Sequence, residues 1–480
     1  MSRFLFVLLF VLYIPAHGQR KEANIWYFGH YAGLDFNAGS PAVLTDGAVR
    51  TNEGTSVASD ADGKLLFYTD GVSVWNRRHR VMPGGTGLWG NESSTQSALI
   101  VPRPESRNIF YVFTTDAEGG LYTDTVSNCG CLSYSVVDLN ADGGLGAVVE
   151  KNTVLHPLMS EKITAVFQPN GRDVWVVTHE LGSNAFRSYP VTAAGISKPV
   201  ISRVGSVHII INNRAAAIGY MKLSPDGRKL ALTTSSTYAE VFEFDAASGM
   251  VRNLVRVYPH KEMPYNSSPI YGLEFSPNSR RLYASQYGRL YRMSVEQHDS
   301  VSISKSVELL FETNPYETQA LCALQLGVDG RIYFAQVIRV ENGFGPSGYV
   351  GVIKDPNRES GDADIEVRHI YLEGRGCMVG LPNFNQSYLY PDDPELEMPD
   401  VFTPNGDQWN DHFTSITRKR VEKVLRVTVC NRWGQAVYQA NHLEGWDGGE
   451  APAGIYYWQI GYEGINGKTF QAKGVVRLLR

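Results

Sequence analysis

Polar side chains that stand just before repeated strands are the strongest candidates for a functional site in this sequence. Each group holds the same place in its repeat, so we expect the groups to share one rim of the folded body. Such a rim could bind a glycan or a protein, and the alternative is that these residues only complete turns and a polar channel. The candidates are Glu53, Thr55, Ser56, Thr95, Gln96, Tyr316, Glu317 and Gln319.

Local motifs for catalysis and metal binding are missing from the sequence. There is no Gly-x-Ser-x-Gly elbow and no His-Glu-x-x-His pair. Residues 138–143 begin like a calcium loop, but the twelfth position is Val149, so the bidentate carboxylate is absent. We therefore expect no enzyme activity, no cofactor and no metal, although a site assembled from distant residues would leave no local motif.

The five cysteines cannot all pair with one another. Cys129 and Cys131 are two residues apart, a spacing poorly suited to a direct disulfide on a strand. Cys322 and Cys377 could form a bridge, and Cys430 stands alone.

The elements that must position the candidate residues come from a repeated strand–turn–strand unit. The clearest copy is residues 223–232, with a Ser-Pro-Asp-Gly turn between two apolar strands. Proline presets φ, aspartate bonds its own backbone, and glycine accepts the left-handed conformation. Equivalent turns contain Asp62, Asn170, Asn278 and Asp329, and a degenerate copy occupies residues 104–108.

The spacing of these turns predicts the architecture of the body. Consecutive turns from Asn170 onward are 56, 52 and 51 residues apart. A period near 50 residues that holds about four short strands is typical of a β-propeller. Residues 20–390 accommodate seven such units, and we expect residues 24–36 to pair with residues 380–384 and close the ring.

The last eighty residues carry an ordered set of motifs between short apolar strands, which predicts a small β-sandwich. We expect Trp433 to lie in a tight hairpin with its indole packed inward. Asn405, Asp407, Asn410 and Asp411 could gather around a cation, but capping of a turn is the favoured role. The motif residues are Phe402, Thr403, Pro404, Asn405, Gly406, Asp407, Asn410, Asp411, Asn431, Arg432, Trp433, Gly434, Trp446, Asp447, Gly448, Gly454 and Tyr456.

These motifs, in this order and spacing, resemble the gliding-motility-associated C-terminal domain, the type B sorting domain read by the bacterial type IX secretion system. The resemblance implies that the type IX machinery is a partner and that the protein is exported across the outer membrane, then released or attached to the cell surface. The repeats of the body are similar to those of TolB-type propellers, which carry the same Ser-Pro-Asp-Gly turn.

The amino-terminal residues agree with export. Residues 1–18 contain a basic start, an apolar run too short to cross a bilayer, and a small-residue cleavage site, which predicts a signal peptide. No other stretch approaches membrane-spanning length, and a net charge of −5 gives no support for nucleic-acid binding.

The predicted organisation is all-β throughout. It comprises a signal peptide (1–18), a seven-bladed β-propeller (20–390), a Pro-rich acidic linker (391–400) and a type B sorting domain (401–480). We predict an exported cell-surface or secreted protein whose propeller binds a glycan or protein. The alternative is an exported propeller enzyme that degrades polysaccharide or peptide.

Overall fold

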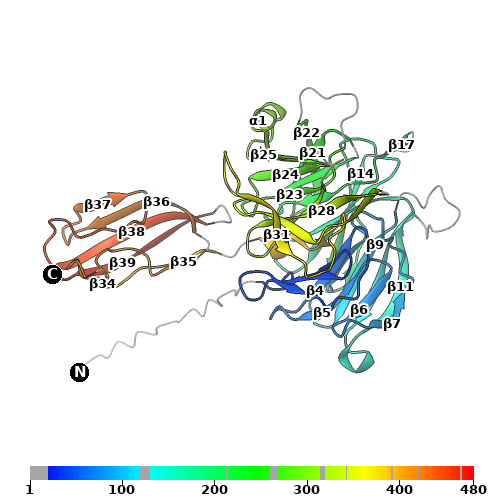
Figure 1. The fold of residues 1–480 in the computed structure, drawn as a ribbon, viewed down its shortest axis with the longest axis horizontal. Coiled ribbons are helices and arrows are strands. Elements are labelled where there is room, and N and C mark those ends of the chain that lie inside the picture. The colour runs from blue at the N-terminus through cyan, green and yellow to red at the C-terminus, as the bar shows by residue number, and fades with distance from the viewer. Residues whose placement is uncertain are drawn as a thin grey trace, which may run out of the picture.

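The computed structural model describes residues 20–117, 130–211, 214–234, 236–259, 269–313, 319–341, 343–390, 393–407, 409–419, 421–464 and 468–480. The predicted signal peptide lies outside these residues. The predicted all-β fold is confirmed, with a body of several sheets and a separate terminal domain (Figure 1). None of the helices in the described part of the chain has the length and apolar character that a membrane crossing requires.

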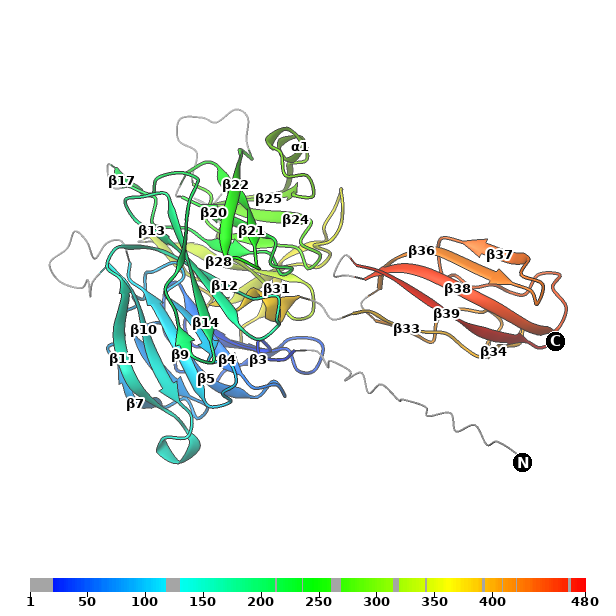
Figure 2. The same cartoon turned by 180° about the vertical axis from the view of Figure 1, so that it is seen from behind.

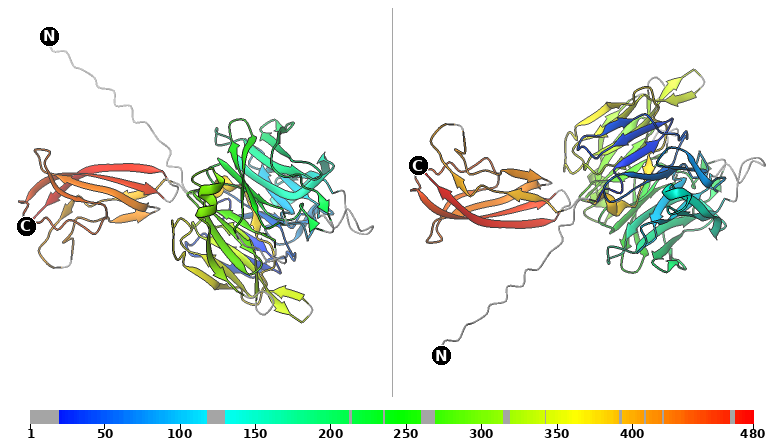
Figure 3. Two further views of the ribbon diagram at one scale, coloured as in Figure 1. Left: turned by 90° about the horizontal axis from the view of Figure 1, so that it is seen from above. Right: turned by 90° about the horizontal axis from the view of Figure 1, so that it is seen from below.

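The described residues of the body form seven sheets of three to five strands, arranged around a common centre (Figures 2 and 3). The first strand of one sheet contacts the first strand of the next, from β1 through β4, β8, β12, β19 and β23 to β27. This succession of neighbours is the arrangement of a propeller and agrees with the predicted seven units.

The strand bounds follow the repeat. The first three sheets are β1 (Ile25–Phe28), β2 (Ala32–Asp35) and β3 (Ala42–Leu44); β4 (Thr55–Ser59), β5 (Leu65–Thr69), β6 (Ser73–Asn76) and β7 (Val81–Thr86), joined by β32 (Pro382–Asn383); and β8 (Ala98–Pro102), β9 (Ile109–Thr115), β10 (Leu132–Asp138) and β11 (Ala147–His156). The next two are β12 (Met159–Phe167), β13 (Val174–Glu180), β14 (Ala185–Thr192), β15 (Gly195–Ile196) and β16 (Val200–Arg203); and β19 (Met221–Leu223), β20 (Lys229–Thr233), β21 (Ala239–Asp245) and β22 (Met250–Val257). The last two are β23 (Leu273–Phe275), β24 (Arg281–Gln286), β25 (Arg289–Ser294) and β26 (Glu308–Glu312); and β27 (Gln319–Leu326), β28 (Ile332–Val340), β29 (Gly343–Pro346), β30 (Tyr349–Ile353) and β31 (Ile365–Tyr371).

Short elements lie between or after these strands. They are the hairpin β17 (Ile210–Ile211) and β18 (Arg214–Ala215), the helix α1 (Ser300–Lys305), and the 3₁₀ turns η2 (Asp142–Gly144) and η3 (Gln386–Leu389).

Every predicted repeat turn joins the first and second strands of a sheet. In the turn between β19 and β20, the Ser224 hydroxyl donates to Asp226 Oδ1 at 2.6 Å, and Gly227 N donates to Ser224 O at 2.8 Å. Between β23 and β24, Ser279 takes the place of glycine with φ of 60°. The hydrogen bonds and the left-handed residue that the repeated turn motif predicts are therefore present.

The two ends of the body meet, though not as predicted. His30 and Gly376 exchange backbone hydrogen bonds of 2.8 and 3.1 Å. Residues 382–383 pair in parallel with β4, however, and not with β1 or β2. Pairing with β4 places the closing segment at the centre of the body, where it completes the first full repeat.

The terminal domain contains two sheets over its own apolar core. The larger sheet is β34 (Val401–Phe402), β39 (Thr469–Leu478), β38 (Gly454–Gly464), β36 (Val421–Cys430) and β37 (Ala436–Ala440), and the smaller is β33 (Glu395–Glu397) with β35 (Thr417–Lys419). Phe402, Trp446 and Tyr456 are among the buried aromatic side chains. Part of the predicted linker is thus a strand of this domain, because residues 395–397 pair with residues 417–419.

Two expectations for the terminal motifs have opposite outcomes. Asn405 N and Gly406 N donate to Asp411 Oδ1 at 3.0 and 2.8 Å, so Asp411 caps the turn as favoured. The Trp433 hairpin joins β36 to β37, but the indole is 79% exposed. The prediction that this indole packs inward is wrong: Trp433 lies in the turn between the two strands, past the end of the sheet.

Cysteine pairing also differs from the expectation. Cys131 is disulfide-bonded. Cys129, the other residue of the spacing argument, lies outside the described residues. Cys322 and Cys377 are both buried and free, so the bridge considered between them is not formed.

Candidate functional site

Two carboxylates from different sheets approach each other near the starts of the central strands. Glu53 precedes β4, and Glu161 is the third residue of β12. Thr95 binds Glu161, since its hydroxyl and its backbone N donate to Glu161 Oε2 at 2.7 and 2.9 Å. The Tyr271 hydroxyl donates to Glu53 Oε2 at 2.8 Å. We call Glu53, Thr95, Glu161 and Tyr271 the central cluster.

The environment of Glu53 favours its protonated form. Burial, followed by the charge of Glu161, raises the pKa of Glu53 to about 8, while the hydrogen bond from Tyr271 opposes this shift. Glu53 and Tyr271 are closely surrounded by protein, yet both keep intermediate solvent exposure. Glu53 is thus held protonated at neutral pH beside a second carboxyl group, that of Glu161, which receives two hydrogen bonds.

The closing segment of the body passes directly over Glu53. Val379 N donates to Asn52 O at 2.9 Å. A Cβ at Gly380 would lie only 2.2 Å from the Glu53 carbonyl oxygen, so no larger residue fits there. Ring closure therefore fixes the backbone that carries this carboxyl.

Lys162, the next residue after Glu161, lies near two buried histidines. The Lys162 ammonium donates to three successive carbonyls, Ala216 O, Ala217 O and Ile218 O, at 2.9, 2.6 and 2.9 Å. The rings of His179 and His208 stack with centroids 3.5 Å apart. Burial, then the Lys162 charge, lowers the pKa of His179 to about 3, so this imidazole is neutral.

A fully buried polar network lies among the inner strands of the body. Lys222 Nζ lies 3.1 Å from Glu274 Oε2, and both side chains have no exposed surface. Gln96 Oε1 accepts from Met221 N at 2.9 Å, and its Nε2 donates to Met221 O at 3.1 Å. These groups have protein partners, so they do not present a ligand site.

The structure separates the predicted rim residues into different roles. Glu53 and Thr95 come together in the central cluster. Thr55 and Ser56 are buried and donate to Tyr27 O and Asn383 O, so they hold the closing segments. Gln96 belongs to the buried polar network, and Gln319 begins β27, half-buried.

Two predicted residues, Tyr316 and Glu317, lie outside the described residues. No motif in the sequence pointed to Glu161, Lys162 or Tyr271. Glu161 and Lys162 lie within a continuous buried strand, and Tyr271 is brought near only by the ring.

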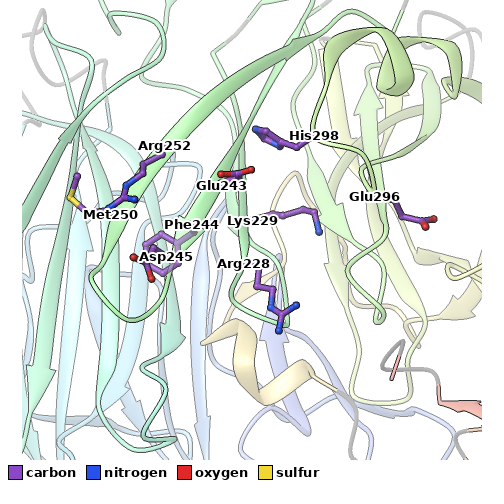
Figure 4. A pocket seen from close by; sticks show the side chains of 9 residues that line it. All are labelled: Arg228, Lys229, Glu243, Phe244, Asp245, Met250, Arg252, Glu296 and His298. Atoms are coloured by element: carbon purple, nitrogen blue, oxygen red, sulfur yellow. The ribbon is translucent and has the colours of Figure 1, made fainter. Parts of the chain in front are cut away.

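A second group of charged side chains lines a cavity of about 370 Å³ beside β20, β21 and β22. Figure 4 shows its side chains spread along the cavity, with Lys229 between Glu243 and Arg228. Glu243 accepts from Asn253, and Glu296 pairs with Arg281. Its carboxylates therefore have partners within the fold, which makes this cavity a weaker candidate than the central cluster.

Comparison with solved structures finds distant matches to the body. The periplasmic gluconolactonase PpgL of Pseudomonas aeruginosa is 14% identical, with a TM-score of 0.39, over 80% of this chain and 95% of that one. A protein from Bacteroides uniformis proposed to be a 6-phosphogluconolactonase is 13% identical, with a TM-score of 0.37, over the same shares. A luciferin-regenerating enzyme is 12% identical, with a TM-score of 0.34, over 68% of this chain and 88% of that one.

These matches correct the prediction that the chain is not an enzyme, because the matched proteins include enzymes. The likeness is too distant to assign any of their reactions to this chain. No curated protein matches the chain.

The terminal motifs, in contrast, have a direct counterpart among known families. The predicted sorting domain is confirmed, since residues 396–478 match the CHU_C type IX secretion signal domain. This protein is therefore an exported one, whose residues 396–478 match the type IX secretion signal domain.

Proposed function

We propose that the protein is an exported enzyme that cleaves a polysaccharide or a peptide by acid–base catalysis at the central cluster. The observation that carries this proposal is the pair formed by Glu53 and Glu161, two carboxyl groups in contrasting environments. Such pairs supply a proton donor and a proton acceptor in one site.

The two residues take distinct roles. Glu53 keeps its proton up to about pH 8, so it serves as the general acid that protonates a leaving group. Glu161 is held by the Thr95 hydroxyl and backbone N, so its carboxylate is oriented to activate water. Tyr271 fixes the orientation of Glu53 through its hydroxyl.

The sequence predicted that the propeller binds a glycan or a protein. Such binding would be the first step of the proposed cleavage, and it remains a proposal. The secretion signal family supports delivery of this activity outside the cell. After export the protein could be released or attached at the surface. We propose attachment to the cell surface, because this location matches a polymeric substrate.

The test uses the purified full-length protein with panels of polysaccharides and peptides, measured by release of reducing ends or of new amines. Glu53→Gln and Glu161→Gln keep the side-chain shapes, and each should lower kcat by about 10²- to 10⁴-fold. Glu243→Gln, in the charged cavity of Figure 4, is the matched control and should leave turnover unchanged. Full turnover in both cluster variants, or no wild-type turnover with any substrate, would refute the proposal.

A further inference from the structure

A second cavity lies at the opposite end of β4 from Glu53. It has a volume of about 500 Å³ and is lined by the β4–β5 turn, by the first strand pair of the next sheet, and by residues 384–388. Ser59, in its wall, is six residues beyond Glu53, which is roughly 20 Å along a strand. We call it the turn-face cavity, and it is separate from the central cluster.

Three polar atoms in the wall of this cavity have no hydrogen-bond partner among the described residues. They are Ser59 Oγ, Asn385 Nδ2 and Glu22 Oε2. Ser59 is 4% exposed and Asn385 is fully buried. Buried polar atoms nearly always have a hydrogen-bond partner. Three such atoms without one around a single cavity, an amide donor, a hydroxyl and a carboxylate oxygen, indicate that the cavity takes a polar ligand.

Aromatic rings form much of the remaining wall. Phe110, Phe384 and Tyr388 line the cavity, and the first two are almost completely buried. Tyr388 is fixed by an edge contact with Phe167, at a centroid distance of 5.6 Å. Apolar rings with a few convergent polar groups, in a cavity of this size, are typical of a small-molecule site.

The charges around the cavity select the kind of ligand. Glu22, Asp60 and Asp62 contribute three carboxylates, against one guanidinium from Arg107. Asp60 Oδ1 accepts from two backbone N–H groups, and Glu22 Oε2 is the buried carboxylate oxygen without a partner among the described residues. An anionic ligand is disfavoured by this balance, whereas a neutral molecule with several hydroxyl groups meets both the donor and the acceptors.

We propose that the turn-face cavity binds a neutral saccharide, with a sugar ring against the aromatic wall and its hydroxyl groups on Asn385, Ser59 and Glu22. Sugars combine an apolar ring face with hydroxyls that donate and accept, which is the pattern that these walls present. The site does not depend on the chemistry of the central cluster. It would hold the exported protein on a glycan whether or not the cluster cleaves it.

The experiment measures binding of neutral and acidic disaccharides to the full-length protein by calorimetry. Cellobiose, maltose and N,N′-diacetylchitobiose are the neutral probes, and digalacturonate is the acidic probe. Asn385→Asp keeps the acceptor for Ser387 N but replaces the open donor, and it should weaken binding at least tenfold. Ser59→Ala, a smaller change, should weaken binding about threefold to tenfold if one hydrogen bond is lost.

The controls separate this site from the central cluster. Glu53→Gln should lower kcat by about 10²- to 10⁴-fold while the disaccharide affinity of the turn-face cavity stays at the wild-type value. Binding of at least one neutral disaccharide, weakened in Asn385→Asp and in Ser59→Ala, is the expected result. Unchanged binding in both variants, no binding of any neutral probe, or equal binding of digalacturonate would overturn the proposal.

Discussion

Replacing Glu53 by Gln should flatten the dependence of stability on pH between pH 4.5 and about 8. The pKa of Glu53 rises from its ordinary value of 4.5 to about 8 in the folded protein. Below pH 4.5 both the folded and unfolded states carry the proton, and its contribution to stability is complete. As the pH rises toward 8, the unfolded chain releases the proton first, so the folded state is progressively destabilised.

The size of the effect follows from the difference between the two pKa values. It corresponds to at most about 5 kcal/mol of unfolding free energy. Because Glu53 keeps partial solvent contact, screening reduces the expected effect to about 2–3 kcal/mol. Chemical denaturation at pH 5 and pH 8.5 should therefore show a larger loss of stability in the wild-type protein than in Glu53→Gln.

Glu243→Gln is the control for this measurement, because Glu243 is exposed. It should lose as much stability as the wild-type protein over the same pH range. Parallel curves for wild type and Glu53→Gln would mean that Glu53 ionises normally, and the assignment of this residue as an acid would fail.

Three further predictions concern other parts of the chain. Deletion of residues 396–480 should leave the protein in the periplasm, measured by fractionation, and efficient export of the truncated chain would contradict the sorting role. Glu274→Ala should destabilise the body by about 3–5 kcal/mol in urea, because it removes the carboxyl partner of the fully buried Lys222. The double change Lys222→Met with Glu274→Leu should cost less. The wild type should lose stability as the pH falls from 6.5 toward 3, because the folded-state pKa of His179 is lowered to about 3. His179→Asn should remove this loss, and unchanged acid unfolding of the variant would contradict the prediction.

The repeat was predictable because its signal is local. Proline, aspartate and glycine fix the turn after β19 by their own backbone preferences, so the turns could be found and spaced without knowledge of the packing. The terminal motifs were predictable for the same reason, since their order and spacing identify the domain. The exposure of Trp433 was not, because a hairpin motif does not say which side chain its sheet will cover.

The central cluster was only half predictable. Glu53 and Thr95 stood out because they precede repeat strands that the turns had already located. Glu161 lies inside the buried run of β12 and resembles any other strand residue in sequence. Its contact with Thr95 spans 66 positions and exists only because neighbouring sheets meet at the centre. Unpaired atoms such as Asn385 Nδ2 are likewise a property of the packing and leave no pattern in the sequence.

The most direct test of the account is the protonation state of Glu53 at neutral pH. Infrared difference spectra of the full-length protein and Glu53→Gln, recorded between pH 4 and pH 9, isolate the carbonyl band of this one carboxylic acid. We predict a band present at pH 7 in the wild type, absent in the variant, and lost with a midpoint near pH 8. Loss of the band near pH 4.5 would show that Glu53 ionises normally and would contradict its role as the acid.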